Sequence, residues 1–132
     1  MPGMAPAVTL ITLAAAALEF GLCGYYWQSA FADTRPWLPQ PLQEEMRARF
    51  AVDRFIWSRA VPLAARRRFL MAHIYGCLGL VSITILAFAN GPLSGGLVFA
   101  AISLLALGQT VVHGRKYQRL LQANVSPPAT AP

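Results

Sequence analysis

Charged residues are scarce in this sequence. Only 12% of the 132 residues are Asp, Glu, Lys or Arg, whereas 56% are hydrophobic. Because soluble domains carry about 25% charged residues, the shortage indicates a membrane protein. The basic residues cluster beside apolar runs, so the formal net charge of +6 is interpreted as a topology signal and a contact for anionic lipid headgroups. Nucleic acid is not expected as a partner.

Cysteines and catalytic motifs are also sparse. The two cysteines, Cys23 and Cys77, both lie inside apolar runs, so no disulfide framework is expected. The sequence contains no glycine-rich phosphate loop, nucleophile elbow, Cys-x-x-Cys pair or His-Glu-x-x-His motif. These absences give soluble enzyme chemistry little support, and no catalytic residue is predicted.

Three apolar runs are long enough to cross a hydrocarbon core about 30 Å thick as helices. The predicted spans cover residues 7–28, 66–89 and 93–113. The tripeptide Asn90-Gly91-Pro92 predicts a tight turn between the second and third spans. The predicted fold class is therefore all-α, with a single integral membrane domain over residues 1–123.

The sequence after the third span predicts a helix end and a tail. Gly114, followed by Arg115 and Lys116, is expected to end the third helix. Residues 124–132 are rich in Pro, Ala, Ser and Thr, which is typical of a disordered tail.

The segment 29–65 is the one sizeable hydrophilic part of the sequence. Beyond its prolines, a helix is predicted from about residue 41 to residue 59, with apolar side chains on one side. The helix is expected to lie flat on the membrane with this side down, or to pack on the ends of the spans. The predicted apolar side consists of Leu42, Met46, Phe50 and Trp57.

The basic residues predict how the chain is threaded. All 11 Lys and Arg residues fall between residues 29 and 68 or after residue 113. With three spans, both segments lie on one side, which the positive-inside rule makes cytoplasmic. The N-terminus is then outside and the C-terminus inside, and a bacterial cytoplasmic (inner) membrane is expected. Predicted lipid-headgroup contacts are Arg66, Arg67, Arg68, Arg115 and Lys116.

Small residues recur at helical spacing in all three spans. Such stripes let helix backbones approach closely in lipid. They predict either a specific docking or oligomer face, or packing of the three helices with one another. The predicted helix-packing residues are Ala14, Ala17, Gly21, Gly24, Ala72, Gly76, Gly79, Gly96 and Ala100.

Polar residues inside the spans predict a layer of possible functional importance. Counting about 1.5 Å per residue from the basic ends of the spans places Cys23 near His73 and Glu19 near Cys77, with Gln109 at the His73 level. One hypothesis is a zinc or copper site made of Glu19, Cys23, His73 and Cys77. A second is a proton- or ion-handling pair of Glu19 and His73 in an oligomeric carrier.

Two further interpretations of the polar layer remain open. A haem ligated by His73, with His113 as a second ligand, is one. The other assigns no chemistry: Glu19 is neutral or hydrogen-bonded to Tyr26, Gln109 or a partner subunit, and His73 is an interfacial residue.

These features favour a non-catalytic small integral membrane subunit or accessory protein. It would dock onto a larger membrane complex through its small-residue helix faces and its amphipathic segment. The expected partners are a bilayer with anionic headgroups and other membrane subunits or further copies of the chain. The alternative is a homo-oligomeric transporter or channel that uses Glu19. A membrane enzyme or metalloprotein is the third possibility, and no cofactor is predicted beyond its metal or haem.

Overall fold

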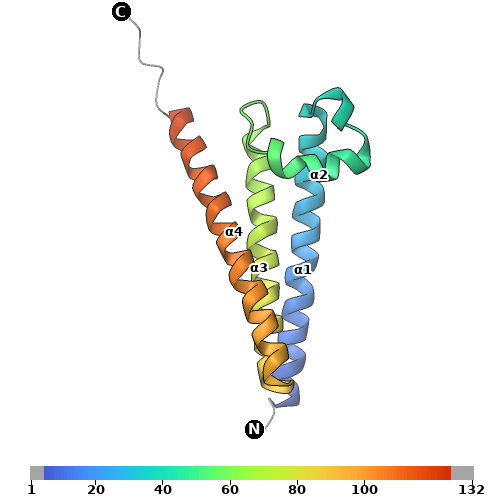
Figure 1. Cartoon of the computed structure of the whole chain (residues 1–132), viewed down its shortest axis with the longest axis vertical. Helices are drawn as coiled ribbons and strands as arrows, with labels where there is room; N and C mark the ends of the chain where they lie inside the picture. Colours follow the sequence, from blue (N-terminus) through green and yellow to red (C-terminus); the bar gives the residue numbers. More distant parts are fainter. Residues whose placement is uncertain (1–4, 126–132) are drawn as a thin grey trace, which may run out of the picture.

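The computed structural model describes residues 5–125 of the chain. Within them the structure is helical and contains no strand, which confirms the all-α prediction. The long helices run along one axis, and a short helix lies across one end of them (Figure 1). The elements are α1 (Pro6–Thr34), the 3-10 turns η1 (Arg35–Trp37) and η2 (Gln40–Leu42), α2 (Glu45–Phe55), α3 (Leu63–Asn90) and α4 (Leu93–Val125).

The three long helices are each long and apolar enough to cross a membrane. Their candidate spans are Pro6–Trp37, Leu63–Asn90 and Leu93–Ala123. Most of their apolar surface faces outward: Leu10 and Leu105, for example, are 67% and 72% exposed. So much exposed hydrocarbon is unfavourable in water but matches a lipid environment. The predicted number of candidate spans is confirmed.

Helix α3 packs against both α1 and α4. On the α1 side, the ring of Phe20 covers Gly79, and the Cys23 sulfur lies against Gly76. On the α4 side, the hydroxyls of Thr84 and Ser103 are 2.9 Å apart and share a hydrogen bond. Small residues therefore let α3 approach both neighbours closely.

Two helices are longer than the sequence predicted. Helix α1 continues past residue 28 to Thr34, and α4 continues past Gly114 to Val125. Gly114 does not end the helix, and no described glycine has the positive φ of a helix C-cap. The helix can continue because an internal glycine costs only about 1 kcal/mol relative to alanine. Residues 124 and 125, predicted to lie in the tail, belong to α4; residues 126–132 lie outside the described part of the chain.

A small hydrophobic core forms where the end of α1, α2 and the start of α3 meet. We call residues 30–69 the head. Phe69 and Ile56 are completely buried there, and Trp27 and Trp57 pack against the core. The core residues are Ala30, Phe31, Leu38, Ala48, Ala51, Val52, Ile56, Val61, Ala65 and Phe69.

Helix α2 is shorter than predicted and buries a different side. Its buried residues are Ala48, Ala51 and Val52, whereas Met46 and Phe50, predicted on the apolar side, are 65% and 81% exposed. The small Ala48 and Ala51 side chains allow α2 to lie close to the end of α1, which larger side chains would prevent. The buried side of α2 is therefore the one that carries Ala48, Ala51 and Val52 rather than the one that carries Met46 and Phe50.

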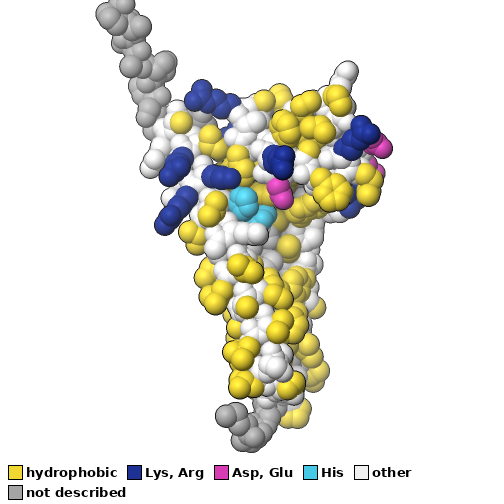
Figure 2. All heavy atoms as spheres, viewed as in Figure 1, with side chains coloured by type: hydrophobic (Ala, Val, Ile, Leu, Met, Phe, Trp, Pro, Cys, Tyr) yellow, Lys and Arg dark blue, Asp and Glu magenta, His cyan; other side chains and the backbone are white. Residues whose placement is uncertain are grey.

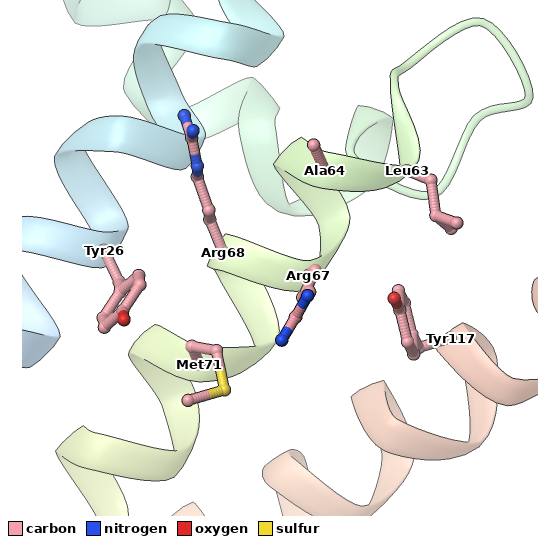
Figure 3. A pocket seen from close by; sticks show the side chains of 7 residues that line it. All are labelled: Tyr26, Leu63, Ala64, Arg67, Arg68, Met71 and Tyr117. Atoms are coloured by element: carbon pink, nitrogen blue, oxygen red, sulfur yellow. The ribbon is translucent and has the colours of Figure 1, made fainter.

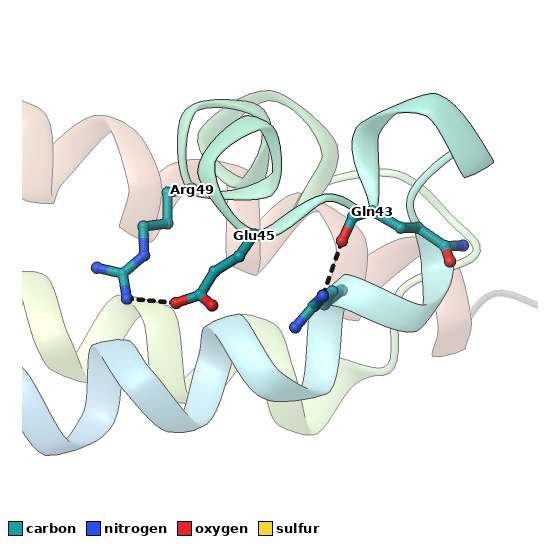
Figure 4. Close-up of polar contacts among 4 residues, drawn as sticks. Gln43, Glu45 and Arg49 are labelled. Carbon is teal, nitrogen blue, oxygen red and sulfur yellow. Dashed lines mark hydrogen bonds and ion pairs between the residues drawn. The ribbon is translucent and has the colours of Figure 1, made fainter.

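Polar contacts hold the turns of the head in place (Figure 4). Arg35 Nε donates a hydrogen bond of 2.8 Å to the backbone oxygen of Gln43, which joins η1 to the segment before α2. Within α2, Arg49 pairs with Glu45 at 2.9 Å. The Arg49 guanidinium also lies 5.9 Å from the ring centroid of Trp27 on α1, within cation–π range.

The charge of the molecule is concentrated at the head end. The segments that carry all 11 basic residues lie at this end, which is the upper end in Figure 1. The lower part of the face in Figure 2 shows mainly hydrophobic side chains. One end of the helix bundle is therefore basic.

Candidate functional site

The polar residues of α1 and α3 meet in a different register from the one predicted. Ser82 donates a hydrogen bond of 2.8 Å to Glu19, and the Cys23 sulfur would be 3.2 Å from a Cβ placed on Gly76. The predicted partners were Cys77 for Glu19 and His73 for Cys23, so the pairing differs by about one helical turn. The count started at residue 28, but α1 continues to Thr34, which moves its residues relative to α3.

A cavity of about 310 Å³ lies between α1, α3 and α4. Four residues of the predicted polar layer line it: Cys23, His73, Cys77 and Gln109. Glu19 does not line it, so the proposed four-residue metal site is not formed. Within residues 5–125, no three His, Cys, Asp or Glu side chains lie close enough together to hold a metal ion.

The two histidines lie together, although they are far apart in the sequence. The ring centroids of His73 on α3 and His113 on α4 are 4.5 Å apart, and the rings are inclined at 60°. His73 Nδ1 is 3.0 Å from the backbone oxygen of Phe69. A carbonyl oxygen only accepts hydrogen bonds, so this contact is a hydrogen bond when Nδ1 carries a proton.

Aromatic residues of the head enclose the histidine pair. Trp57 stacks on His113 at 5.4 Å, and Phe69 packs edge-on against the same ring at 5.4 Å. Asp53 of α2 lines a neighbouring cavity with both histidines. Figure 2 shows the histidine side chains just below the basic end. We call Trp57, Phe69, His73 and His113 the ring cluster.

The geometry of the ring cluster limits its chemistry. A haem held by both His73 and His113 would have to lie between their rings, but the rings contact each other and leave no space for it. Two ring nitrogens, His113 Nδ1 and Trp57 Nε1, are buried without a hydrogen-bond partner in the described chain. The cluster is therefore a packed aromatic group with two unpaired polar atoms.

Sequence reasoning did not find most of the ring cluster. It placed Trp57 on the apolar side of a helix that faces either lipid or the ends of the spans, and it related the two histidines only as ligands of a haem. The spacing of four between Phe69 and His73 was a visible signal, because such residues share a helix face. No local pattern relates Trp57 to His113, because they belong to different segments.

The three arginines at the start of α3 do not act alike. Arg66 is only 3% exposed and donates a hydrogen bond of 2.5 Å to the backbone oxygen of Ser58. Arg66, a predicted headgroup contact, is therefore enclosed by the loop before α3. Arg68 pairs with Asp33 of α1 at 2.6 Å, and Arg67 is exposed. Arg115 and Lys116 are also exposed on α4.

The small residues of α1 form an exposed face. A Cβ added to Gly21 or Gly24 would meet nothing within 4 Å. By contrast, Ala72, Gly79 and Gly96 are buried between helices. Ala100 is half-buried and Gly76 contacts Cys23. We call the exposed set the α1 stripe; it consists of Ala14, Ala17, Gly21 and Gly24.

These features define the class of the molecule: a small all-helical protein with three candidate membrane-spanning helices and a compact basic head. No protein-family profile, curated protein or solved structure matches the chain. The functional argument therefore depends on the residues and their contacts.

Proposed function

We propose that the chain is a non-catalytic integral membrane subunit or accessory protein of a larger membrane complex. It docks through the α1 stripe against an apolar transmembrane helix of another subunit. The observation that carries the proposal is the contrast between the stripes: small residues of α3 and α4 pack inside the chain, whereas the α1 stripe is exposed.

The α1 stripe is suited to a helix partner rather than to a soluble ligand. Its members are uncharged and spaced three or four residues apart, so they lie on one side of α1. Small side chains allow two helix backbones to approach closely, and van der Waals packing then drives association in lipid. Helices α1 and α3 approach closely in the same way, at the small residues Gly76 and Gly79.

The proposed orientation places the N-terminus outside and the head and C-terminus in the cytoplasm of a bacterial inner membrane. Its support is the concentration of all 11 basic residues in the segments at one end of the bundle. Reporter fusions at residue 1 and after residue 132 test it. Cytoplasmic activity from both termini, or from neither, would contradict the three-span orientation.

The docking face is tested by enlarging its glycines. A Cβ on Gly21 or Gly24 would meet no described atom within 4 Å, so we expect the fold to survive Gly21→Leu and Gly24→Leu while the partner helix is kept away. Gly108→Leu is a matched control, because Gly108 is equally open but lies on α4. We expect crosslinking in native membranes, followed by mass spectrometry, to lose the partner with the α1 variants alone.

Two outcomes would contradict the docking proposal. One is retention of the same partners by both α1 variants. The other is a wild-type chain that is captured without a different membrane protein. Crosslinks exclusively between copies of this chain would indicate a homo-oligomer in place of the larger complex.

The alternative, a homo-oligomeric transporter or channel that uses Glu19, has weaker support. The carboxylate is half-buried, and its hydrogen-bond partner, Ser82, belongs to the same chain. An intramembrane acid is nevertheless a functional candidate. The alternative predicts that the wild-type protein carries ions or a substrate across the membrane of proteoliposomes. It also predicts that Glu19→Gln abolishes this flux. Absence of flux in the wild type rejects it.

A further inference from the structure

Within residues 5–125, the arginine triplet at the start of α3 contains one guanidinium group without an ion-pair or hydrogen-bond partner. Successive residues of a helix turn through about 100°, so the three side chains leave α3 in different directions. Arg66 is buried in the head and Arg68 is paired with Asp33. Arg67 makes no ion pair or hydrogen bond within residues 5–125. Figure 3 shows its guanidinium between Met71 and Tyr117.

A cavity of about 440 Å³ lies beside Arg67. Helix α1 contributes Tyr26, α4 contributes Tyr117, and α3 contributes Arg67, Arg68 and Met71 (Figure 3). Within the described chain no acidic side chain lines this cavity. Its polar groups are two guanidinium groups and two phenol hydroxyls, all of which can donate hydrogen bonds. The cavity therefore favours an anion.

The charge balance points to a singly charged anion. Arg68 and Asp33 form a pair at 2.6 Å and nearly cancel each other, which leaves the positive charge of Arg67. A phosphodiester carries one negative charge. Guanidinium presents parallel N–H donors that match two phosphate oxygens.

The position of the cavity points to a lipid as the source of the phosphate. Arg68 is followed by the long uncharged part of α3, so the cavity lies where that part begins. Met71, Leu78 and Ile85 are spaced seven residues apart, about two helical turns, and so lie on one side of α3. Leu78 and Ile85 are exposed. They offer an apolar surface that continues from the cavity and can contact acyl chains.

We propose that this cavity binds the phosphodiester headgroup of one anionic phospholipid, with Arg67 as the main phosphate contact. A zwitterionic lipid fits less well, because its ammonium group would meet Arg67 and Arg68 and no carboxylate in the lining. The proposal rests on the placement of the chain in a bilayer, but not on docking through the α1 stripe.

Lipid titration of the purified full chain in detergent micelles tests the site. The probes are phosphatidylglycerol, phosphatidylcholine and free glycerol phosphate, and bound lipid is counted by native mass spectrometry. We expect one phosphatidylglycerol per chain, with phosphatidylcholine and glycerol phosphate binding at least about tenfold more weakly. Equal binding of phosphatidylcholine, tighter binding of free glycerol phosphate, or no bound phosphatidylglycerol would each overturn the proposal.

Charge-matched variants assign the binding to Arg67. Loss of one charged hydrogen bond weakens affinity about tenfold or more, so Arg67→Gln should weaken phosphatidylglycerol binding by that factor. Arg119→Gln, on exposed α4 surface, should change it less than about twofold. Equal losses would show nonspecific charge attraction and overturn the site.

A second variant keeps the test decisive if Arg67→Gln unfolds. Arg67→Lys preserves the charge but removes the paired donors, so we expect an intermediate loss of lipid affinity. Unchanged affinity in a folded Arg67→Lys protein would contradict the proposed contact. Crosslinking of the Arg67→Gln variant to its partner is measured separately. Loss of lipid with retained partners affects the lipid site alone and leaves the docking proposal intact. Loss of partners with retained lipid would count against the docking proposal and leave the lipid site intact.

Discussion

The Ser82 hydroxyl donates a hydrogen bond of 2.8 Å to a carboxylate oxygen of Glu19. This bond joins α1 to α3 within the apolar stretches of both helices, and both side chains are half-buried. A carboxylate near the centre of a membrane helix costs about 3 kcal/mol on insertion scales. The hydroxyl offsets part of this cost and links the two helices at this level.

Removing the hydroxyl should destabilise the helix pair. Ser82→Ala leaves Glu19 without its partner in the described chain, and we expect a loss of about 1–2 kcal/mol in the free energy of unfolding. Equilibrium unfolding in mixed micelles measures it. In a Glu19→Ala background the same substitution should cost less than about 0.5 kcal/mol, because the interaction is already absent. Equal costs in both backgrounds would contradict a specific bond.

Gly96 lies against the Phe88 ring where α4 turns back against α3. A Cβ on Gly96 would clash with that ring, so Gly96→Ala forces the ring to move. We expect a loss of about 1–3 kcal/mol in unfolding free energy, typical of overpacking. Gly108→Ala, at an open position on the same helix, should cause no loss. If Phe88 simply rotates away, Gly96→Ala will match this control.

The sequence was sufficient to predict the three long helices and the turn that joins the last two. Long uncharged runs and Asn90-Gly91-Pro92 are local signals, and the structure ends α3 at Asn90 and begins α4 at Leu93. The end of α1 was less visible. Residues after 28 contain no strong helix breaker before Pro36, so the helix continues to Thr34 and displaces the predicted polar register.

The head and the ring cluster depend on contacts between distant segments. The buried side of α2 could not be read from hydrophobicity, because Phe50 is more hydrophobic than Ala48 yet is exposed. The buried side of α2 is the one that faces the core shared by α1, α2 and α3. Likewise, Trp57 and His113 belong to segments far apart in the sequence and meet only in the folded chain. Sequence patterns indicate faces of single helices, but not which faces meet.

Replacing His113 distinguishes packing from polar chemistry. His113→Phe keeps an aromatic ring against Trp57 and removes the buried, unpaired Nδ1 atom. We therefore expect equal or higher stability, whereas His113→Ala should lose about 1–2 kcal/mol of unfolding free energy with its ring contacts. Thermal unfolding in detergent compares the two. A loss with Phe as large as with Ala would show that the imidazole nitrogens make an essential polar contact.

Neighbouring arginines of the triplet should differ in their effects on stability. Arg66 is buried and holds the Ser58 carbonyl, so Arg66→Ala removes a charged hydrogen bond and packing by the side-chain stem. The expected loss is about 1.5–3 kcal/mol in unfolding free energy. Arg67→Ala should change stability by less than about 0.5 kcal/mol, since Arg67 has no partner within residues 5–125.

Equilibrium unfolding measures the free energies of both arginine variants. The micelles contain no lipid, because a bound lipid could hide the difference in stability between the two variants. Arg66→Met preserves much of the apolar stem and should recover part of the loss, because the remaining cost is then the lost Arg66 hydrogen bond to the Ser58 oxygen, which still accepts one from the Val61 N–H. Similar losses for Arg66→Ala and Arg67→Ala would mean that the triplet acts only as a band of surface charge. In that case the hydrogen bond from Arg66 to the loop before α3 would add no measurable stability to the head.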